Sequence, residues 1–252
     1  MALGGQLSLI IFNINYLLTS LKKRTMKTVP QIDGEKIINF LGLAHDDYLA
    51  SRLLLLNGML PQGCALAATS IEKYLKAILS VHNEKIPKKS HLSNKLTFLI
   101  KKIYPELYDE LYRDDFVKFL GIAYDVLRYA PIQNNGFSIV LNQYRTLERL
   151  DNVVANLEKG FDIKKDNKTI ETSLHRDVKN NSLMLIKDNV VFGNISKEEL
   201  FAKENLVHEL KVGKNLITLQ YKYTTEVVFD TGSFCKKPEL TRDKPSFTRT
   251  NG

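Results

Sequence analysis

Apolar residues recur at three- and four-residue spacing along residues 34–160, the pattern of helices that each bury one face. The first predicted helix spans about 34–57 and the second about 62–82, with Gly58 and Pro61 marking the turn between them. In the first helix the repeat consists of Ile37, Ile38, Leu41, Ala44, Tyr48 and Leu49. This part of the chain therefore predicts helices that pack against one another.

Further helices follow in the same region. One begins near Ser90, which is a good N-cap, and a short helix is predicted at 105–112 behind its first-turn proline. Two more are predicted at about 114–128 and 138–159, and Gly160 ends the last. Because short connections between amphipathic helices favour antiparallel neighbours, we predict a mainly α fold, an up-and-down bundle of about five helices.

The pattern of apolar and polar residues changes after the predicted bundle. Residues 161–180 are polar and aperiodic and are predicted to form a linker. A small β-rich region is predicted at 181–230, with one hairpin at 182–194 around Asp188-Asn189 and another at 207–229. The last residues, 231–252, are predicted to form a flexible tail. The sequence thus predicts a helical bundle followed by a small β-containing C-terminal region.

Residues 1–33 are predicted to be an extension ahead of the bundle. Their apolar run, Leu7–Leu18, is interrupted by Asn13 and Asn15 and is shorter than the roughly 20 residues of a membrane-spanning helix. Basic residues follow this run instead of preceding it, which argues against a secretory signal. Met26 opens an ordinary polar lead-in to the first helix, so we expect the 25 residues before it to be an over-extended start, with Met26 as the alternative to Met1.

The composition indicates the class of protein and the cellular compartment. Over 252 residues, 44% hydrophobic and 25% charged side chains are ordinary for a globular protein without membrane spans. The formal net charge of +8 favours phosphate-bearing partners, although basic chains often bind no nucleic acid. Two distant cysteines, Cys64 and Cys235, form no CxxC motif and fit a reducing compartment, so we expect a cytoplasmic protein.

The sequence holds no motif for a metal or a cofactor. Its five histidines show no metal-ligand spacing, and the nucleotide-binding and hydrolase motifs GxGxxG, GxxxxGK[ST] and GxSxG do not occur. We therefore expect no cofactor and no metal site.

The densest positive charge lies between Asn83 and Tyr104, where six lysines face the single acidic residue Glu84, a local net charge of +5. His91 lies in the middle of this segment. Several lysines near a polyanion release counterions, so the segment is a candidate phosphate-binding rim. A solvated loop and helix face would give the same pattern, and both interpretations stay open.

Arg128 and Tyr129 stand at the end of a predicted helix, directly before Ala130 and a proline. A guanidinium can clamp a phosphate while a neighbouring ring stacks on a base. Alternatively, the arginine complements its own helix dipole and pairs with Asp125. On the second helix, Lys73 and Lys76 share a face that need not be buried and is available to a ligand.

At these residues the chain resembles the HEPN domain family of helical bundles from prokaryotic nucleotide- and RNA-directed systems. The resemblance covers about 35–160 and is carried by an alanine-rich start to the second helix, then IEKYLKAIL, SHLSNKL and YDVLRYAP. Catalytic members resemble metal-independent ribonucleases in which an arginine is followed four to six positions later by histidine. Arg128 matches that arginine, but Gln133, Asn134 and Asn135 stand in the histidine window.

The resemblance therefore implies a nucleotide- or RNA-binding homodimer that lacks nuclease activity, because an amide exchanges no protons near neutral pH. The RYAP stretch is similar to the branch of the family that binds nucleotides without cutting RNA. The implied polyanion site consists of Arg128, Tyr129, Lys73, Lys76 and His91.

Two other functions stay open. One is a divergent, metal-independent ribonuclease toxin that uses His91 as its base, provided that folding brings His91 to the arginine. The other is a protein-interaction module whose C-terminal strands and loose tail form the partner surface, within a prokaryotic defence or toxin–antitoxin pair that includes a nucleotidyltransferase.

Overall fold

A computed structural model shows how these segments are arranged. It describes residues 10–12, 34–87, 91–92, 94–113, 115–129, 137–159, 161, 163–165, 168–212, 217–224 and 235–236. The predicted N-terminal extension and the predicted tail lie outside the described residues, apart from two short strands. Met1 and Met26 both belong to the part that is not described.

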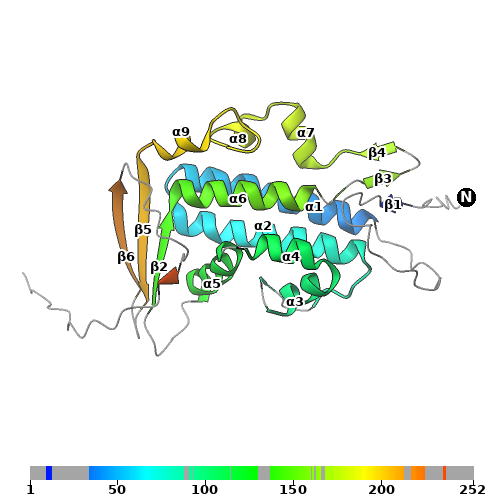
Figure 1. Cartoon of the computed structure of the whole chain (residues 1–252), viewed down its shortest axis with the longest axis horizontal. Coiled ribbons are helices and arrows are strands. Elements are labelled where there is room, and N and C mark those ends of the chain that lie inside the picture. The colour runs from blue at the N-terminus through cyan, green and yellow to red at the C-terminus, as the bar shows by residue number, and fades with distance from the viewer. Residues whose placement is uncertain are drawn as a thin grey trace, which may run out of the picture.

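The fold is mainly α, as the sequence predicts, and a helical bundle is followed by a β-containing C-terminal region (Figure 1). The bundle helices are α1 (Gly34–Leu56), α2 (Leu60–Val81), α3 (Asn94–Ile103), α4 (Pro105–Leu111), α5 (Phe116–Tyr129) and α6 (Gln143–Glu158). The later helices are α7 (Ser173–Lys179), α8 (Leu183–Ile186) and α9 (Lys197–Phe201). None of the helices in the described ranges is long and apolar enough to cross a membrane.

Close packing of α1 on α2 forms the centre of the bundle. A Cβ at Gly63 would lie 2.6 Å from Cγ of Leu55, so only glycine allows this approach. Ser51 Oγ donates a hydrogen bond to the Gly63 carbonyl at 2.8 Å and ties the two helices together. Ala67 and Ala68 continue this buried small-residue side of α2, which is why the second helix starts with small residues.

A four-stranded antiparallel sheet closes one end of the bundle (Figure 1). Its order is β6-β5-β2-β7, with β2 (Phe137–Asn142), β5 (Asn205–Val212), β6 (Ile217–Thr224) and β7 (Cys235–Lys236). The predicted hairpin around residue 214 is confirmed, since β5 and β6 pair from Asn205↔Thr224 to Val212↔Ile217. A second sheet, of β1 (Ile10–Phe12), β3 (Ile163–Lys165) and β4 (Lys168–Ile170), lies at the other end.

The prediction of a helix from Ser138 onward is wrong, because residues 137–142 form β2 and the helix begins at Gln143. Asn142 is the N-cap, and its side chain accepts a hydrogen bond from the Arg145 amide at 3.0 Å. Leu141 fits the helical repeat of the following segment, but it pairs with His208 of β5 instead.

The predicted hairpin at 182–194 is also wrong, since Leu183–Ile186 form α8 and a turn follows. The buried side chain of Asn189 builds this turn, and its Oδ1 accepts the amides of Val191 and Phe192, both at 2.9 Å. A Cβ at Gly193 would lie 2.2 Å from the Ile186 carbonyl oxygen, so the turn requires glycine there.

Residues 171–204, with α7, α8 and α9, form a strap that runs back along α1 and α6 (Figure 1). Three leucines, one on each strap helix, are buried against the bundle or its strap neighbours: Leu174, Leu185 and Leu200. Polar contacts add to them, including His45 Nε2 with Asp177 Oδ2 at 2.7 Å and Thr172 Oγ1 with Glu158 Oε2 at 3.1 Å. The strap starts inside the predicted linker, whose status as a domain boundary stays a prediction.

Candidate functional site

One face of α2 carries a group of neighbouring polar and charged side chains. Thr69, Glu72, Lys73 and Lys76 recur at three- and four-residue spacing and therefore share that face. The opposite side of α2 is built from apolar residues such as Ile71, which is fully buried. The amphipathic pattern of α2 thus fixes where these polar groups lie relative to the bundle core.

Glu72 is the centre of this face. Although it is charged, the residue is only 7% exposed. Its Oε1 accepts a hydrogen bond from the ammonium of Lys76, four residues later, and its Oε2 lies 3.1 Å from Nδ1 of His91. An ionised carboxylate only accepts hydrogen bonds, so Nδ1 of His91 carries the proton in this pair.

His91 connects α2 with α5. Its ring lies 4.9 Å from the ring of Tyr124, centroid to centroid and tilted by 39°. The His91 side chain is 43% exposed, whereas Tyr124 is buried in α5. With Nδ1 bound to Glu72, Nε2 is the nitrogen that is left to accept a proton or contact a ligand.

Arg128 and Tyr129 belong to the last turn of α5. Arg128 follows Tyr124 by four residues, so its Cα lies one turn further along the helix face that meets His91. The side chains of Arg128 and Tyr129 lie outside the part of the chain that the structure describes. Their predicted contact with a phosphate and a base therefore stays a prediction.

Lys73 is held by α1. Its ammonium lies 2.7 Å from Oδ2 of Asp47, which also accepts a hydrogen bond from Thr69 Oγ1 at 2.7 Å. Lys73 and Lys76 thus each have a carboxylate partner. This pairing reduces the positive charge that the two lysines offer to a polyanion, so a phosphate bound here needs a further cation.

Sequence reasoning missed Asp47, Glu72 and Tyr124 as parts of this site. The Glu72–Lys76 spacing of four was a visible signal, and it forms the ion pair that such spacing favours. Asp47 and Tyr124 reach the site only through the packing of α1 and α5 on α2. No local pattern marks that packing.

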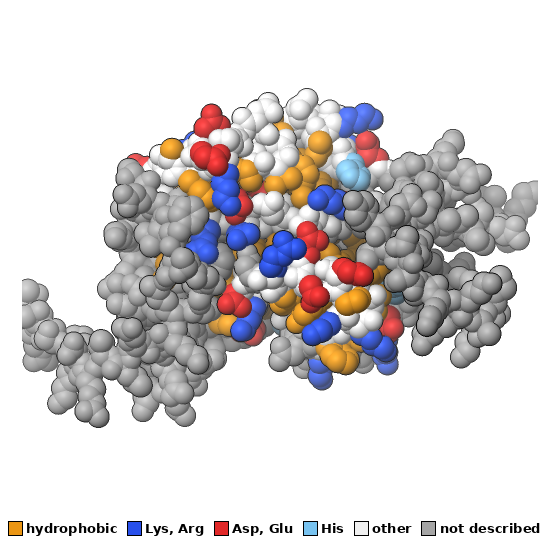
Figure 2. Space-filling view, viewed as in Figure 1, with side chains coloured by type: hydrophobic (Ala, Val, Ile, Leu, Met, Phe, Trp, Pro, Cys, Tyr) orange, Lys and Arg blue, Asp and Glu red, His pale blue; other side chains and the backbone are white. Residues whose placement is uncertain are grey.

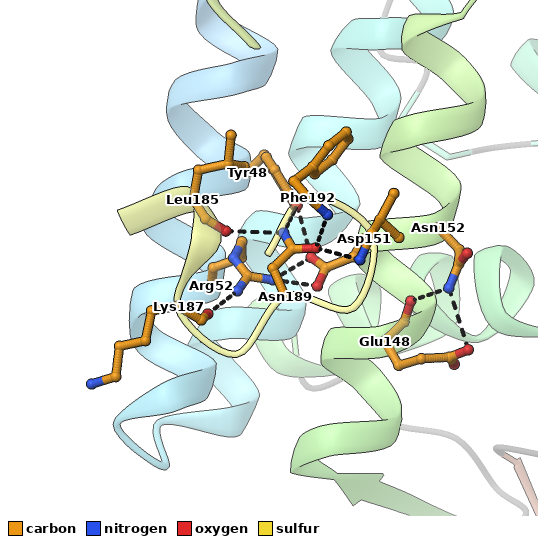
Figure 3. A network of polar contacts seen from close by, with 10 residues as sticks. Tyr48, Arg52, Glu148, Asp151, Asn152, Leu185, Lys187, Asn189 and Phe192 are labelled. Atoms are coloured by element: carbon orange, nitrogen blue, oxygen red, sulfur yellow. Dashed lines mark hydrogen bonds and ion pairs between the residues drawn. The ribbon is translucent and has the colours of Figure 1, made fainter. Parts of the chain in front are cut away.

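A second polar network lies inside the molecule, between α1, α6 and the strap (Figure 3). The guanidinium of Arg52 pairs with Asp151, and both side chains have no solvent exposure. Tyr48 donates a hydrogen bond to Asp151 Oδ1 at 2.7 Å, and Asn189 donates one to the Tyr48 oxygen at 3.1 Å. Burial raises the pKa of the Asp151 carboxyl although Arg52 opposes it, and burial also raises the pKa of Tyr48.

This internal network is structural, because a ligand cannot reach it without displacing the strap. Among the described residues, no group of three or more His, Cys, Asp or Glu side chains is arranged to hold a metal ion. The thiol of Cys64 is buried in the core, and burial raises its pKa to about 12, which leaves it unreactive. The candidate site is therefore the α2–α5 face with Glu72, Lys76, His91 and the end of α5.

The fold and this face define a class: a helical-bundle domain with a partly exposed imidazole–carboxylate pair between two of its helices. A model of the HEPN domain matches residues 39–165, which is about half of the chain and runs from within α1 to the end of β3. The chain belongs to the HEPN domain family, a superfamily related to nucleotides and RNA. No curated protein and no solved structure gives a significant match to it.

Proposed function

We propose that this HEPN-domain protein binds the phosphates of nucleotides or RNA at the α2–α5 face and does not cleave RNA through the family's arginine–histidine pair. The observation that carries the proposal is the position of His91, held by Glu72 of α2 and Tyr124 of α5 one turn before Arg128. This arrangement gathers an imidazole and a guanidinium-bearing turn on one side of the bundle.

The residues have distinct roles in this proposal. Arg128 contacts the phosphate as a bidentate donor and Tyr129 stacks on the base. His91 adds a hydrogen bond from Nε2 when it is protonated, with Glu72 holding the ring in place. Lys73 and Lys76 orient Asp47 and Glu72 and contribute less to the phosphate, because each is already paired.

Arg128→Ala tests the binding site. Loss of a charged hydrogen bond pair is expected to weaken binding of a labelled nucleotide or short RNA by about tenfold or more. Binding by the wild type is expected to weaken as salt rises, measured by fluorescence anisotropy at two salt concentrations. Lys179→Ala, which breaks an exposed ion pair with Glu171 on the strap, is the control. Equal binding by the Arg128 variant and the wild type would exclude the site.

A metal-independent ribonuclease is the second candidate, and the Glu72–His91 pair specifically favours it. Nε2 of His91 would take the proton of a ribose 2′-hydroxyl, and the 2′-oxygen would attack the adjacent phosphorus. The 5′-oxygen then leaves with a proton from solvent, which gives a 2′,3′-cyclic phosphate and a 5′-hydroxyl. Arg128 would stabilise the charge on the phosphorane.

RNA cleavage in the presence of a metal chelator separates the two candidates. Cleavage that His91→Gln and Arg128→Ala both abolish supports the ribonuclease and overturns the proposal of binding alone. Binding without cleavage in the wild type supports the leading proposal. The homodimer is tested by measuring the molar mass in solution, and a monomer at all concentrations would contradict it.

We also propose a cytoplasmic setting in a prokaryotic defence or toxin–antitoxin pair with a nucleotidyltransferase partner. The family membership of residues 39–165 supports this setting, and the β5–β6 hairpin offers an edge for a partner. Co-purification from the native host tests it, since a nucleotidyltransferase should be recovered with the chain. Recovery of the chain without one would contradict the pairing.

A further inference from the structure

The outer face of α3 carries an exposed aromatic ring between lysines. Phe98 is 66% exposed, and Lys95, Lys101 and Lys102 stand one turn before and after it, all three exposed. On the other side of α3, Leu96 and Ile100 are fully buried in the core. The helix is therefore anchored by its inner side and presents this outer face to solvent.

Phe98 has no role in the core, because it is absent from the buried cluster that Leu96 and Ile100 join. Within the described ranges, Phe98 is the only aromatic side chain among the large hydrophobic side chains that are exposed, and the others are Ile, Leu, Val and Met. Figure 2 shows hydrophobic side chains beside Lys or Arg along the lower edge of the molecule, where Figure 1 places α3. An exposed ring beside cations has the composition of a stacking surface for bases.

The charge around the ring is one-sided. Helix α3 contains no acidic residue. The next helix, α4, turns its tyrosines to α3, since the Lys101 ammonium lies 5.0 Å from the Tyr108 ring centroid and Tyr108 stacks on Tyr112. By helical periodicity, Glu106 and Glu110 lie on the side of α4 opposite the tyrosines, and Asp109 lies between those two sides. Among the described residues, Lys95, Lys101 and Lys102 form no ion pair with a carboxylate, unlike the paired lysines of α2.

We propose that the outer face of α3 binds single-stranded nucleic acid, with Phe98 stacking on a base and Lys95, Lys101 and Lys102 contacting the flanking phosphates. The proposal deepens the proposed function, because it names a strand instead of a free nucleotide as the ligand. A mononucleotide carries phosphate on only one side of its base. A strand carries a phosphate on each side and can therefore contact lysines one turn before and one turn after the ring.

The test uses the full chain and a labelled oligoadenylate of about 12 nucleotides, as RNA and as DNA, with a labelled mononucleotide in parallel. Phe98→Ala is expected to weaken strand binding by about tenfold and to leave mononucleotide binding unchanged. Phe98→Trp retains the stacking ring and should bind the strand as the wild type does. Leu183→Ala, at a residue of α8 that is 78% exposed, is the matched control.

Replacing Lys101 and Lys102 by glutamine tests the phosphate contacts. The slope of log affinity against log salt is expected to become shallower by about 0.7 for each lysine removed. All variants should keep the wild-type melting temperature, because the replaced side chains are exposed. An unchanged slope would overturn the assignment of these lysines.

Each outcome separates this inference from the proposed function. Strand binding that needs Phe98 but not Arg128 supports the α3 surface and removes the α2–α5 site. Nucleotide binding that needs Arg128, with strand binding indifferent to Phe98, overturns the α3 surface and leaves the proposed function. No binding of any ligand overturns both. A change of oligomeric state in Phe98→Ala would assign the ring to a protein contact and also overturn the inference.

Equal affinity for RNA and DNA means that the surface contacts only bases and phosphates. Tighter binding of RNA means that the 2′-hydroxyl also contributes to binding.

Discussion

Arg52 is the largest side chain without solvent exposure in the part of the chain that the structure describes. Its guanidinium contacts Asp151 of α6 and the carbonyl of Lys187 in the strap. A buried charge of this kind is tolerated only because its partners are charged or strongly polar, and removal of one partner leaves the other desolvated. The fold of α1, α6 and the strap therefore depends on this residue.

Arg52→Ala is expected to lower the free energy of unfolding by about 3–5 kcal/mol, because Asp151 and Tyr48 stay buried without their cation. Urea denaturation followed by circular dichroism measures the change. The control is Lys179→Ala at the exposed pair with Glu171, which should cost less than about 1 kcal/mol. Replacement of Arg52 by Met together with Asp151→Leu should recover much of the loss. Equal effects of Arg52→Ala and of the lysine control on the free energy of unfolding would contradict the role of Arg52.

We expect His82 to make the free energy of unfolding sensitive to acid. It caps α2, its Nε2 contacts the Tyr104 hydroxyl, and the two rings meet edge to face at 4.6 Å. Burial lowers its pKa from the ordinary value of 6.5, although Glu84 opposes the shift. The native state therefore binds fewer protons than the unfolded state, and stability is lost as the pH falls through the unfolded pKa.

The melting temperature of the wild type should fall more than that of His82→Gln between about pH 7.5 and about pH 5.5. Glutamine keeps a polar group near Tyr104 but cannot titrate in this range. Differential scanning fluorimetry at matched ionic strength measures both curves. Parallel curves for the two proteins would show that His82 does not control the acid response.

The helices and strands that a local sequence pattern specifies are the ones that the sequence predicts correctly. The α1, α2, α4 and α5 helices and the β5–β6 hairpin match their predictions closely, because each is specified by a local repeat or turn. The strand β2 does not match its prediction, since its partner β5 lies more than sixty residues later and its Leu141 also fits a helical repeat. At the site, Lys76 and His91 meet through Glu72, a contact that depends on the loop before α3 and on packing that no local pattern encodes.

Asn189 stabilises the turn that the structure has where the sequence predicted a hairpin. Its side chain is fully buried and also donates to the Tyr48 oxygen and, at 3.0 Å, to the Leu185 carbonyl. Asn189→Ala leaves the Leu185 carbonyl and the two turn amides without this side-chain partner, while Tyr48 keeps its bond to Asp151, so a loss of about 1–3 kcal/mol in unfolding free energy is expected. Asn194→Ala, at an exposed position in the same loop, is the control and should have little effect. The urea midpoints of the two variants measure the difference, and equal midpoints would contradict the role of Asn189.

At the scale of the whole molecule, the family match ends at an earlier residue than the folded unit does. The HEPN match ends at residue 165, but the strap at 171–204 buries its leucines and covers the Arg52–Asp151 pair. A bundle without the strap would expose a charged pair and apolar surface to water. We therefore expect the bundle and the strap to unfold together, and the predicted linker to join parts of one cooperative unit.

Limited trypsin digestion tests this expectation, because proteolysis requires local unfolding of the segment that is cut. The strap offers several target sites: Arg176, Lys179, Lys187, Lys197 and Lys203. If the strap is integral, mass spectrometry should find a resistant fragment that begins near residue 34 and continues beyond Lys203. A cut near residue 165 should leave two pieces that elute together in gel filtration, since packing still holds the strap on α1 and α6. A stable fragment that ends near residue 165, with the strap digested, would show that the bundle folds alone.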